Sequence, residues 1–91
     1  MNQTDLIEEV ANEAKLTKTQ TQDVLRALMK TIMKVVAEGD RVTLAGFGSF
    51  EPRQRSAREG RNPKTGETVH IPAATVPTFS AGKKFREAVN K

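Results

Sequence analysis

A series of cationic side chains runs through one stretch of the sequence. Its members are Arg53, Arg55, Arg58, Arg61 and Lys64, and the acidic residues nearest to them along the stretch are Glu59 and Glu67. The arginine guanidinium is a planar fork of hydrogen-bond donors that binds phosphate and fits a narrow minor groove. The series therefore indicates a surface for a polyanion. The alternative is a solvated strand edge that charge protects from aggregation.

A turn signal lies in the middle of this series. Asn62 at the first position, Pro63 at the second and Gly66 shortly after suit a tight reversal, because proline fixes φ and glycine accepts positive φ. The sequence thus predicts a two-stranded ribbon that runs out through residues 53–61 and returns through residues 67–73.

Pro63 would then lie at the tip of the ribbon, flanked by cations and an amide. A compact apolar ring without an N–H can wedge between two base pairs, unstack them and kink a duplex. Turn geometry alone also accounts for a proline here. The two interpretations are compatible, since the turn would present the ring.

The spacing of the arginines leaves the form of the ribbon open. Arg53 and Arg55 share strand parity while Arg58 has the other, so the ribbon either contains a bulge or presents cations on both faces. Val69 and Ile71 are the only large apolar residues of this segment. Two such residues are too few for a core, so we expect the ribbon to project or to stay mobile.

Other kinds of chemistry have little support in the sequence. His70 is the single histidine and has no nucleophile or carboxylate pair beside it, so we expect no catalytic residue, no metal site and no small-molecule substrate or cofactor. Recognition of RNA or single strands relies on stacking platforms, yet the chain has no Tyr or Trp. Its four phenylalanines lie outside the ribbon at expected packing positions. A protein-interaction module or a membrane-surface binder remains an alternative use of a basic face.

The charge of the chain is unevenly placed. Residues 1–51 hold six Lys or Arg against eight Asp or Glu, whereas residues 52–91 hold nine against three. This asymmetry is typical of a scaffold that carries a polyanion-binding surface, although a basic face kept for solubility is the alternative. With no cysteine, no apolar run of about 20 residues and no basic leader, we expect a cytoplasmic protein without a membrane span.

The first half of the sequence predicts two helices. Apolar residues recur at three- and four-residue intervals from Leu6 to Ala14, preceded by Asn2 as a helix start. Thr17 and Gln20 form a capping-box pattern that opens a second helix, and Gly39 is placed to end it. The apolar positions of this second helix are Val24, Leu25, Leu28, Met29, Ile32, Met33, Val35 and Val36.

This apolar set is wider than one short neighbouring helix can cover. A chain of 91 residues also buries only a modest part of its surface when it folds alone. We therefore infer a homodimer or a heterodimer with a close paralogue. The alternative is that the surplus packs only against the strands that follow.

The second half predicts strands and a last helix. Val42 and Leu44 alternate with polar residues before two glycines and two phenylalanines, which suggests a hairpin whose second strand continues into the ribbon. Residues 75–79 return to the body through Val76 and Phe79. Ser80 is predicted to cap a final helix, whose residues include Lys83, Lys84, Phe85, Arg86 and Val89.

At this level of detail the chain resembles the HU and integration host factor family of bacterial histone-like, DNA-bending proteins. The motifs that carry the resemblance are Gly46-Phe47-Gly48-Ser49-Phe50, Arg55, Arg58, Gly60-Arg61-Asn62-Pro63-Lys64-Thr65-Gly66, Ile71-Pro72-Ala73 and Phe79-Ser80-Ala81-Gly82-Lys83. The resemblance implies an α+β fold in an intertwined dimer: an N-terminal helical hairpin, a short antiparallel sheet extended into a long β-ribbon arm, and a C-terminal helix. One domain would span residues 1–91, with a helical dimerisation part (1–38), a sheet (41–80) whose arm covers about 53–75, and a helix (81–91).

The resemblance also implies a function and its residues. The two arms of a dimer would hold double-stranded DNA in the minor groove, and bend and condense it in the bacterial nucleoid. DNA-binding residues would be Arg53, Arg55, Arg58, Arg61, Asn62, Pro63, Lys64, Thr65, Gly66, Lys83 and Arg86, with Pro63 intercalating. The HU branch fits best, which implies low sequence specificity and a preference for bent, nicked or flexible duplexes; a site-specific integration-host-factor-like subunit is the alternative.

Two positions depart from the pattern of the family. Pro52 sits where the arm leaves the body, and a proline there would delete a donor from the strand ladder and kink the arm base. Thr75 occupies a place where relatives often carry a basic residue, so one phosphate contact would be missing. These departures concern the arm angle and the affinity, not the mode of binding.

Overall fold

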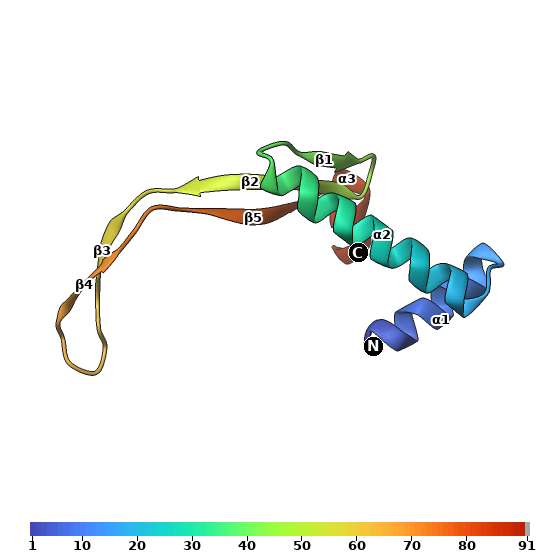
Figure 1. Ribbon diagram of the computed structural model, residues 1–91, viewed down its shortest axis with the longest axis horizontal. Helices are drawn as coiled ribbons and strands as arrows, with labels where there is room; N and C mark the ends of the chain where they lie inside the picture. The colour runs from blue at the N-terminus through green and yellow to red at the C-terminus, as the bar shows by residue number, and fades with distance from the viewer. Residues whose placement is uncertain (91) are drawn as a thin grey trace. The chain divides into compact units, whose positions relative to one another are not determined.

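The computed structural model describes residues 1–90. The chain divides into two compact units, Met1–Lys34 and Val35–Lys91. Figure 1 labels the elements, which in chain order are α1 (Gln3–Ala14), α2 (Lys18–Ala37), β1 (Val42–Leu44), β2 (Gly48–Arg55), β3 (Arg58–Arg61), β4 (Thr68–Ile71), β5 (Ala74–Ala81) and α3 (Lys83–Val89). The predicted α+β fold class is confirmed. Within residues 1–90, no helix is long and apolar enough to cross a membrane.

The first unit is a helical hairpin, and local contacts explain where its helices begin. The Asn2 side chain accepts a hydrogen bond from the Asp5 N–H (2.9 Å), and the Asp5 carboxylate accepts one from the Asn2 N–H (3.3 Å). Thr17 and Gln20 exchange the same pair of bonds at the start of α2, both at 3.0 Å. Each capping box satisfies two backbone donors that a helix start leaves free, so both predicted starts are confirmed.

The end of α2 follows from one glycine. Gly39 has φ of +93°, a left-handed conformation that costs a residue with a side chain more than it costs glycine. Its N–H donates to the Val36 carbonyl (3.0 Å), and the Asp40 N–H donates to the Val35 carbonyl (3.1 Å). These two bonds are a Schellman motif, which confirms the predicted end of the helix.

The hairpin has a very small interior. Its buried side chains are Ile7, Ala11 and Thr21, and the Thr21 hydroxyl donates to the Thr17 carbonyl (2.9 Å). Eight larger apolar residues of the same unit are exposed: Met1, Leu6, Val10, Leu16, Val24, Leu28, Met29 and Met33. The helical hairpin therefore leaves an apolar surface uncovered.

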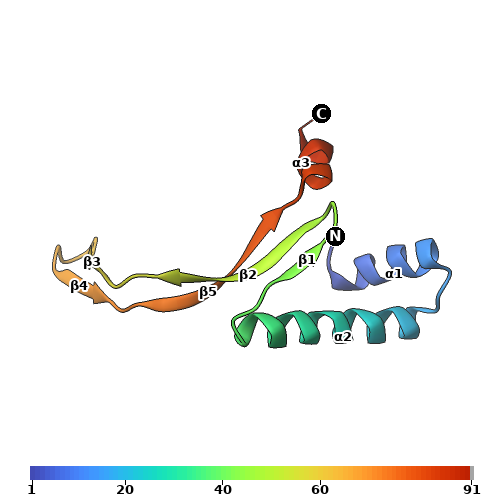
Figure 2. The same cartoon turned by 90° about the horizontal axis from the view of Figure 1, so that it is seen from above.

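The second unit contains two antiparallel sheets. β1, β2 and β5 form one sheet in the order β1-β2-β5, and β3 and β4 form the other. Figures 1 and 2 show β3 and β4 continuing the β2–β5 pair away from the three-stranded sheet as a long ribbon. The predicted hairpin and ribbon are thus confirmed in outline.

The ribbon differs from its prediction in one respect, because its ladder is not continuous. Strand pairing stops after Arg55 and Ala74 and resumes at Arg58 and Ile71. Pro72 lies in the gap on the return side and has no N–H to donate, which accounts for the interruption there. Pairing of β2 with β5 continues past Pro52 for three more residues, so this proline does not interrupt the ladder.

Four aromatic rings form the packed part of the second unit. Phe79 lies 4.9 Å from Phe50, 5.4 Å from Phe47 and 6.1 Å from Phe85 between ring centroids, and Phe47 lies 5.2 Å from Phe85. These distances are typical of favourable aromatic pairs. The phenylalanines pack on one another as expected and none lies on β3 or β4, but Phe47, Phe79 and Phe85 are also 38–45% exposed.

The start of α3 corrects a second prediction. Ser80 does not cap this helix, because it lies within β5 and pairs with Ser49. The cap residue is Gly82, which makes no side-chain cap bond. A β-carbon at Gly82 would lie 2.9 Å from the Gly46 carbonyl oxygen, and the Gly82 N–H donates to the Phe47 carbonyl (2.7 Å). Close packing against the β1–β2 turn therefore selects glycine here.

Candidate nucleic-acid interface

The tip of the ribbon is a hydrogen-bonded loop. The Asn62 N–H donates to the Glu67 carbonyl (2.8 Å), and the Gly66 N–H donates to the Asn62 carbonyl (2.7 Å). The Asn62 side chain accepts from the Lys64 N–H (2.9 Å), and the Thr65 hydroxyl accepts from the Glu67 N–H (3.3 Å). Gly66 has φ of +76°, as the turn requires. The predicted reversal is confirmed, and these side-chain bonds define the shape of the loop.

Pro63 lies in this loop, directly after Asn62. Its ring is exposed, whereas the neighbouring Asn62 is half-buried and its side-chain oxygen accepts from the Lys64 N–H. The loop therefore presents an apolar ring at the end of the ribbon, with Lys64 exposed beside it. Such a projection is suited to contact a flat apolar surface such as the face of a base pair.

The arginines of the ribbon lie on more than one face. Arg53 is opposite Val76 and Arg55 is opposite Ala74, so these two arginines share a face of the β2–β5 pair. Arg58 is opposite Ile71 and Arg61 is opposite Thr68, three positions apart on β3, so they lie on opposite faces. Of the two outcomes left open by the sequence, the second occurs: cations lie on both faces, and the interruption of the ladder spans two residues on each strand, so it is not a bulge.

The ribbon cations carry uncompensated charge. Among residues 1–90, none of Arg53, Arg55, Arg58, Arg61 or Lys64 has an acidic partner within 4.0 Å, and all five are exposed. Glu59 lies instead against His70, with 3.4 Å between Oε1 and Nδ1. By contrast, Arg41 in the body pairs with Glu51 at 2.6 Å. The free positive charge of this unit is therefore concentrated on the ribbon.

Lys83 and Arg86 lie on α3, away from the ribbon. α3 follows the end of β5 where Ala81 pairs with Gly48, and the ribbon begins at the other end of the same strands. Both side chains are exposed, and the Lys83 amino group is 4.0 Å from the Glu87 carboxylate. The structure thus does not bring these two residues together with the ribbon cations.

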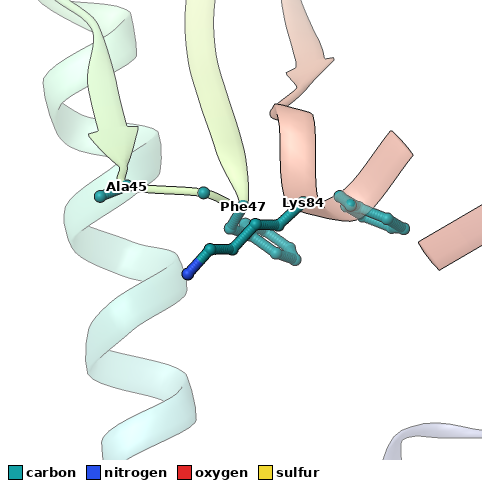
Figure 3. A pocket seen from close by; sticks show the side chains of 5 residues that line it. Ala45, Phe47 and Lys84 are labelled. Carbon is teal, nitrogen blue, oxygen red and sulfur yellow. The ribbon is translucent and has the colours of Figure 1, made fainter. Parts of the chain in front are cut away.

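Lys84 is a residue that the sequence did not single out. Its aliphatic stem lies over Gly46, where a β-carbon would be 3.0 Å from the lysine Cδ. The stem helps to line a shallow, open surface pocket of about 400 Å³, formed by Ala45, Gly46, Phe47, Lys84 and Phe85 (Figure 3). The signal in the sequence is Gly46, since its missing side chain leaves room for the lysine stem. Among the described residues, no group of three or more metal-ligating side chains occurs.

Comparisons with known proteins agree with this architecture along the whole chain. The profile of the family described as "Bacterial DNA-binding protein" matches residues 1–90. The DNA-binding protein HU of Nostoc sp. is 58% identical over 89 residues, covering 98% of this chain and 95% of the relative. The DNA-binding protein HU of Clostridium pasteurianum is 50% identical over 91 residues and covers all of both chains.

Solved structures show the same similarity. A cocrystal structure of Anabaena HU with DNA superimposes with a TM-score of 0.92 at 58% identity, covering 98% of this chain and 97% of that one. HU from Thermotoga maritima gives a TM-score of 0.70 at 30% identity, with 98% of both chains covered. The fold, the ribbon and the identity over the full length agree, and the chain therefore belongs to the bacterial DNA-binding protein family that includes the HU proteins.

Proposed function

We propose that this chain is a histone-like protein that binds double-stranded DNA in the minor groove and bends it, with little dependence on base sequence. The observation that carries this proposal is the exposed ribbon with its five unpaired cations. A ribbon without a core of its own gains most from a partner that offers both negative charge and a groove. Duplex DNA offers both.

The similarity to HU supports the same partner. The Anabaena relative, 58% identical to this chain, was crystallised with DNA. The relatives are named for DNA binding and not for a reaction, so we assign this chain no catalytic role. Condensation of DNA in the bacterial nucleoid is the process that such binding serves.

Pro63 acts in this proposal as a wedge. Its exposed ring would enter between two base pairs from the minor groove, while Lys64, Thr65 and Gly66 contact the groove edges beside it. Unstacking a step costs a few kcal/mol, and contacts along the bent duplex repay that cost. Nicked, bent or flexible DNA is cheaper to unstack, so we expect such duplexes to be preferred.

A dimer completes the arrangement. The helical part, residues 1–38, would form the dimerisation surface, since Val24, Leu28 and Met33 are exposed while only two apolar side chains of the described chain are buried. A second copy or a close paralogue would cover this surface and bring a second arm, in the intertwined form expected for the family. Each arm, about residues 53–75, would follow the groove on one side of the bend, with Lys83 and Arg86 near the flanking phosphates.

A gel-shift comparison tests this proposal. Intact, nicked and random-sequence duplexes of equal length are each titrated with the full chain at two salt concentrations. We expect binding to all three, with the nicked duplex bound most tightly. Binding to one defined sequence alone would favour a site-specific protein, and no binding at low salt would overturn the proposal.

A further inference from the structure

The two faces of the β3–β4 ribbon differ in chemistry. Strand register places Arg58, Gly60, Val69 and Ile71 on one face, and Glu59, Arg61, Thr68 and His70 on the other. The first face, called the apolar face below, carries one positive charge and no acidic group. The second, called the polar face, carries one cation, one carboxylate and the single histidine.

Contacts confirm this division. A β-carbon at Gly60 would lie 3.0 Å from Cδ1 of Ile71, so the isoleucine side chain covers the glycine on the apolar face. On the other side, Glu59 and His70 face each other across the strands, with 3.4 Å between Oε1 and Nδ1 and about two-thirds of each side chain exposed. The polar face therefore has an interaction of its own, whereas Val69 on the apolar face remains 45% exposed.

We propose that the ribbon meets DNA with its apolar face, so that Gly60, Val69 and Ile71 lie against the floor and sugar walls of the groove while Glu59 and His70 face solvent. This inference rests on the proposed function and assigns an orientation to it.

Charge and shape both favour this orientation. A minor groove only about 6 Å wide is lined by two rows of phosphates, and a carboxylate turned into it would meet like charge on both sides. Glu59 would occupy that position if the polar face turned inward. The apolar face offers Arg58 to the phosphates, and the side-chain-free Gly60 under Ile71 keeps the ribbon thin.

Arg61 is consistent with this orientation although it lies on the polar face. It occupies the last pair before the loop, where its long side chain can reach around the ribbon edge to a phosphate. Its guanidinium then holds the ribbon against the groove wall from outside. Arg58 and Arg61 would thus contact the DNA phosphates from the two faces of the ribbon.

Cysteine accessibility tests the orientation cleanly because the chain has no cysteine of its own. Val69→Cys and His70→Cys place a thiol at adjacent positions on opposite faces, and Ile71→Cys with Thr68→Cys is a second such pair. Each full-length variant is treated with a maleimide, free and with saturating duplex, and the two modification rates of the same variant are compared. Saturation is verified by gel shift, so a change in affinity does not affect the comparison.

We expect DNA to slow modification on the order of tenfold or more at Val69→Cys and Ile71→Cys, and less than about twofold at His70→Cys and Thr68→Cys, because only an accessible thiolate reacts. Protection of the polar-face thiols, alone or equally with the others, would overturn the orientation and leave the proposed function intact. Unchanged rates at all four positions in a saturated complex would refute both the orientation and the ribbon as the DNA-binding element.

Discussion

Pro52 and Pro77 lie directly opposite each other where β2 pairs with β5. Neither has an N–H, yet the ladder passes through this pair without a break. Antiparallel strands alternate between pairs that exchange hydrogen bonds and pairs whose N–H groups point away from the partner. The two prolines fit the second type, so both missing donors fall on the open edges of the sheet, where proline also discourages pairing with another chain.

The first prediction follows from that alternation. The next pair along the strands is Arg53 with Val76. By the alternation, this pair is of the type that exchanges hydrogen bonds. Val76→Pro should lower the free energy of unfolding by about 1–3 kcal/mol more than Val76→Ala does, because it leaves a ladder acceptor without its donor. Pro77→Ala should change this free energy by no more than about 1 kcal/mol. Urea unfolding at a fixed chain concentration measures all three; equal effects of proline and alanine at position 76 would contradict the pairing assignment.

The salt dependence of DNA binding is the second prediction. Several cations on each ribbon displace counterions from the duplex when they contact its phosphates. Affinity should therefore fall on the order of 10³-fold or more between about 50 and 200 mM salt. Fluorescence anisotropy with a labelled duplex gives the slope. An affinity independent of salt would show that the ribbon cations do not contact phosphates.

The third prediction concerns the arginines on the two faces of β3. The double variant Arg58→Ala/Arg61→Ala should lower affinity for all duplexes alike, on the order of tenfold or more, because it removes two charge-assisted contacts to the backbone. In a dimer it removes four cations, two from each arm, so it should also make the salt slope shallower by up to about 3–4. Lys18→Ala/Lys30→Ala, in the helical hairpin, removes the same formal charge and is the control. If both double variants lose affinity equally, net charge and not the ribbon governs binding.

The fourth prediction separates bending from binding. Pro63→Ala removes the ring at the tip and leaves in place the residues whose hydrogen bonds shape the loop. The bend angle, measured by energy transfer between dyes at the duplex ends, should decrease more than the affinity does. Asn62→Ala removes the acceptor that holds Lys64 and is a useful comparison, since it disturbs the loop and leaves the ring. An unchanged bend with Pro63→Ala would exclude intercalation by this residue.

The last prediction concerns the uncovered face of the helical hairpin. Val24 is 59% exposed in the single chain, so an aspartate there would cost little in a monomer. If a second copy covers it, Val24→Asp buries an unpaired charge and should weaken self-association on the order of 10²-fold or more. Asn12→Asp introduces the same charge at another exposed helical position and is the control. Sedimentation across a range of concentrations measures the effect, and a wild-type chain that stays monomeric throughout would refute the dimer.

Features held by contacts close in sequence were predictable. The capping boxes at Asn2 and Thr17, the Schellman end at Gly39 and the turn after Asn62 each involve residues within five positions of one another. Such bonds depend on the types and spacing of neighbouring residues, which are visible in the sequence. The ribbon was also predictable, because its segment holds too few large apolar residues to form a core.

Features that depend on distant partners were not predictable. Ser80 has the chemistry of a helix cap, but pairing with Ser49 keeps it in a strand, and the packing of Gly82 against Gly46 moves the helix start two residues on. Three other features likewise depend on contacts between residues that are distant in sequence. They are the gap in the ladder, the packing of the Lys84 stem over Gly46 and the packing of the Ile71 side chain over Gly60. A shift of one residue in that register would exchange the two faces of the ribbon, so only the folded chain establishes which side chains share a surface.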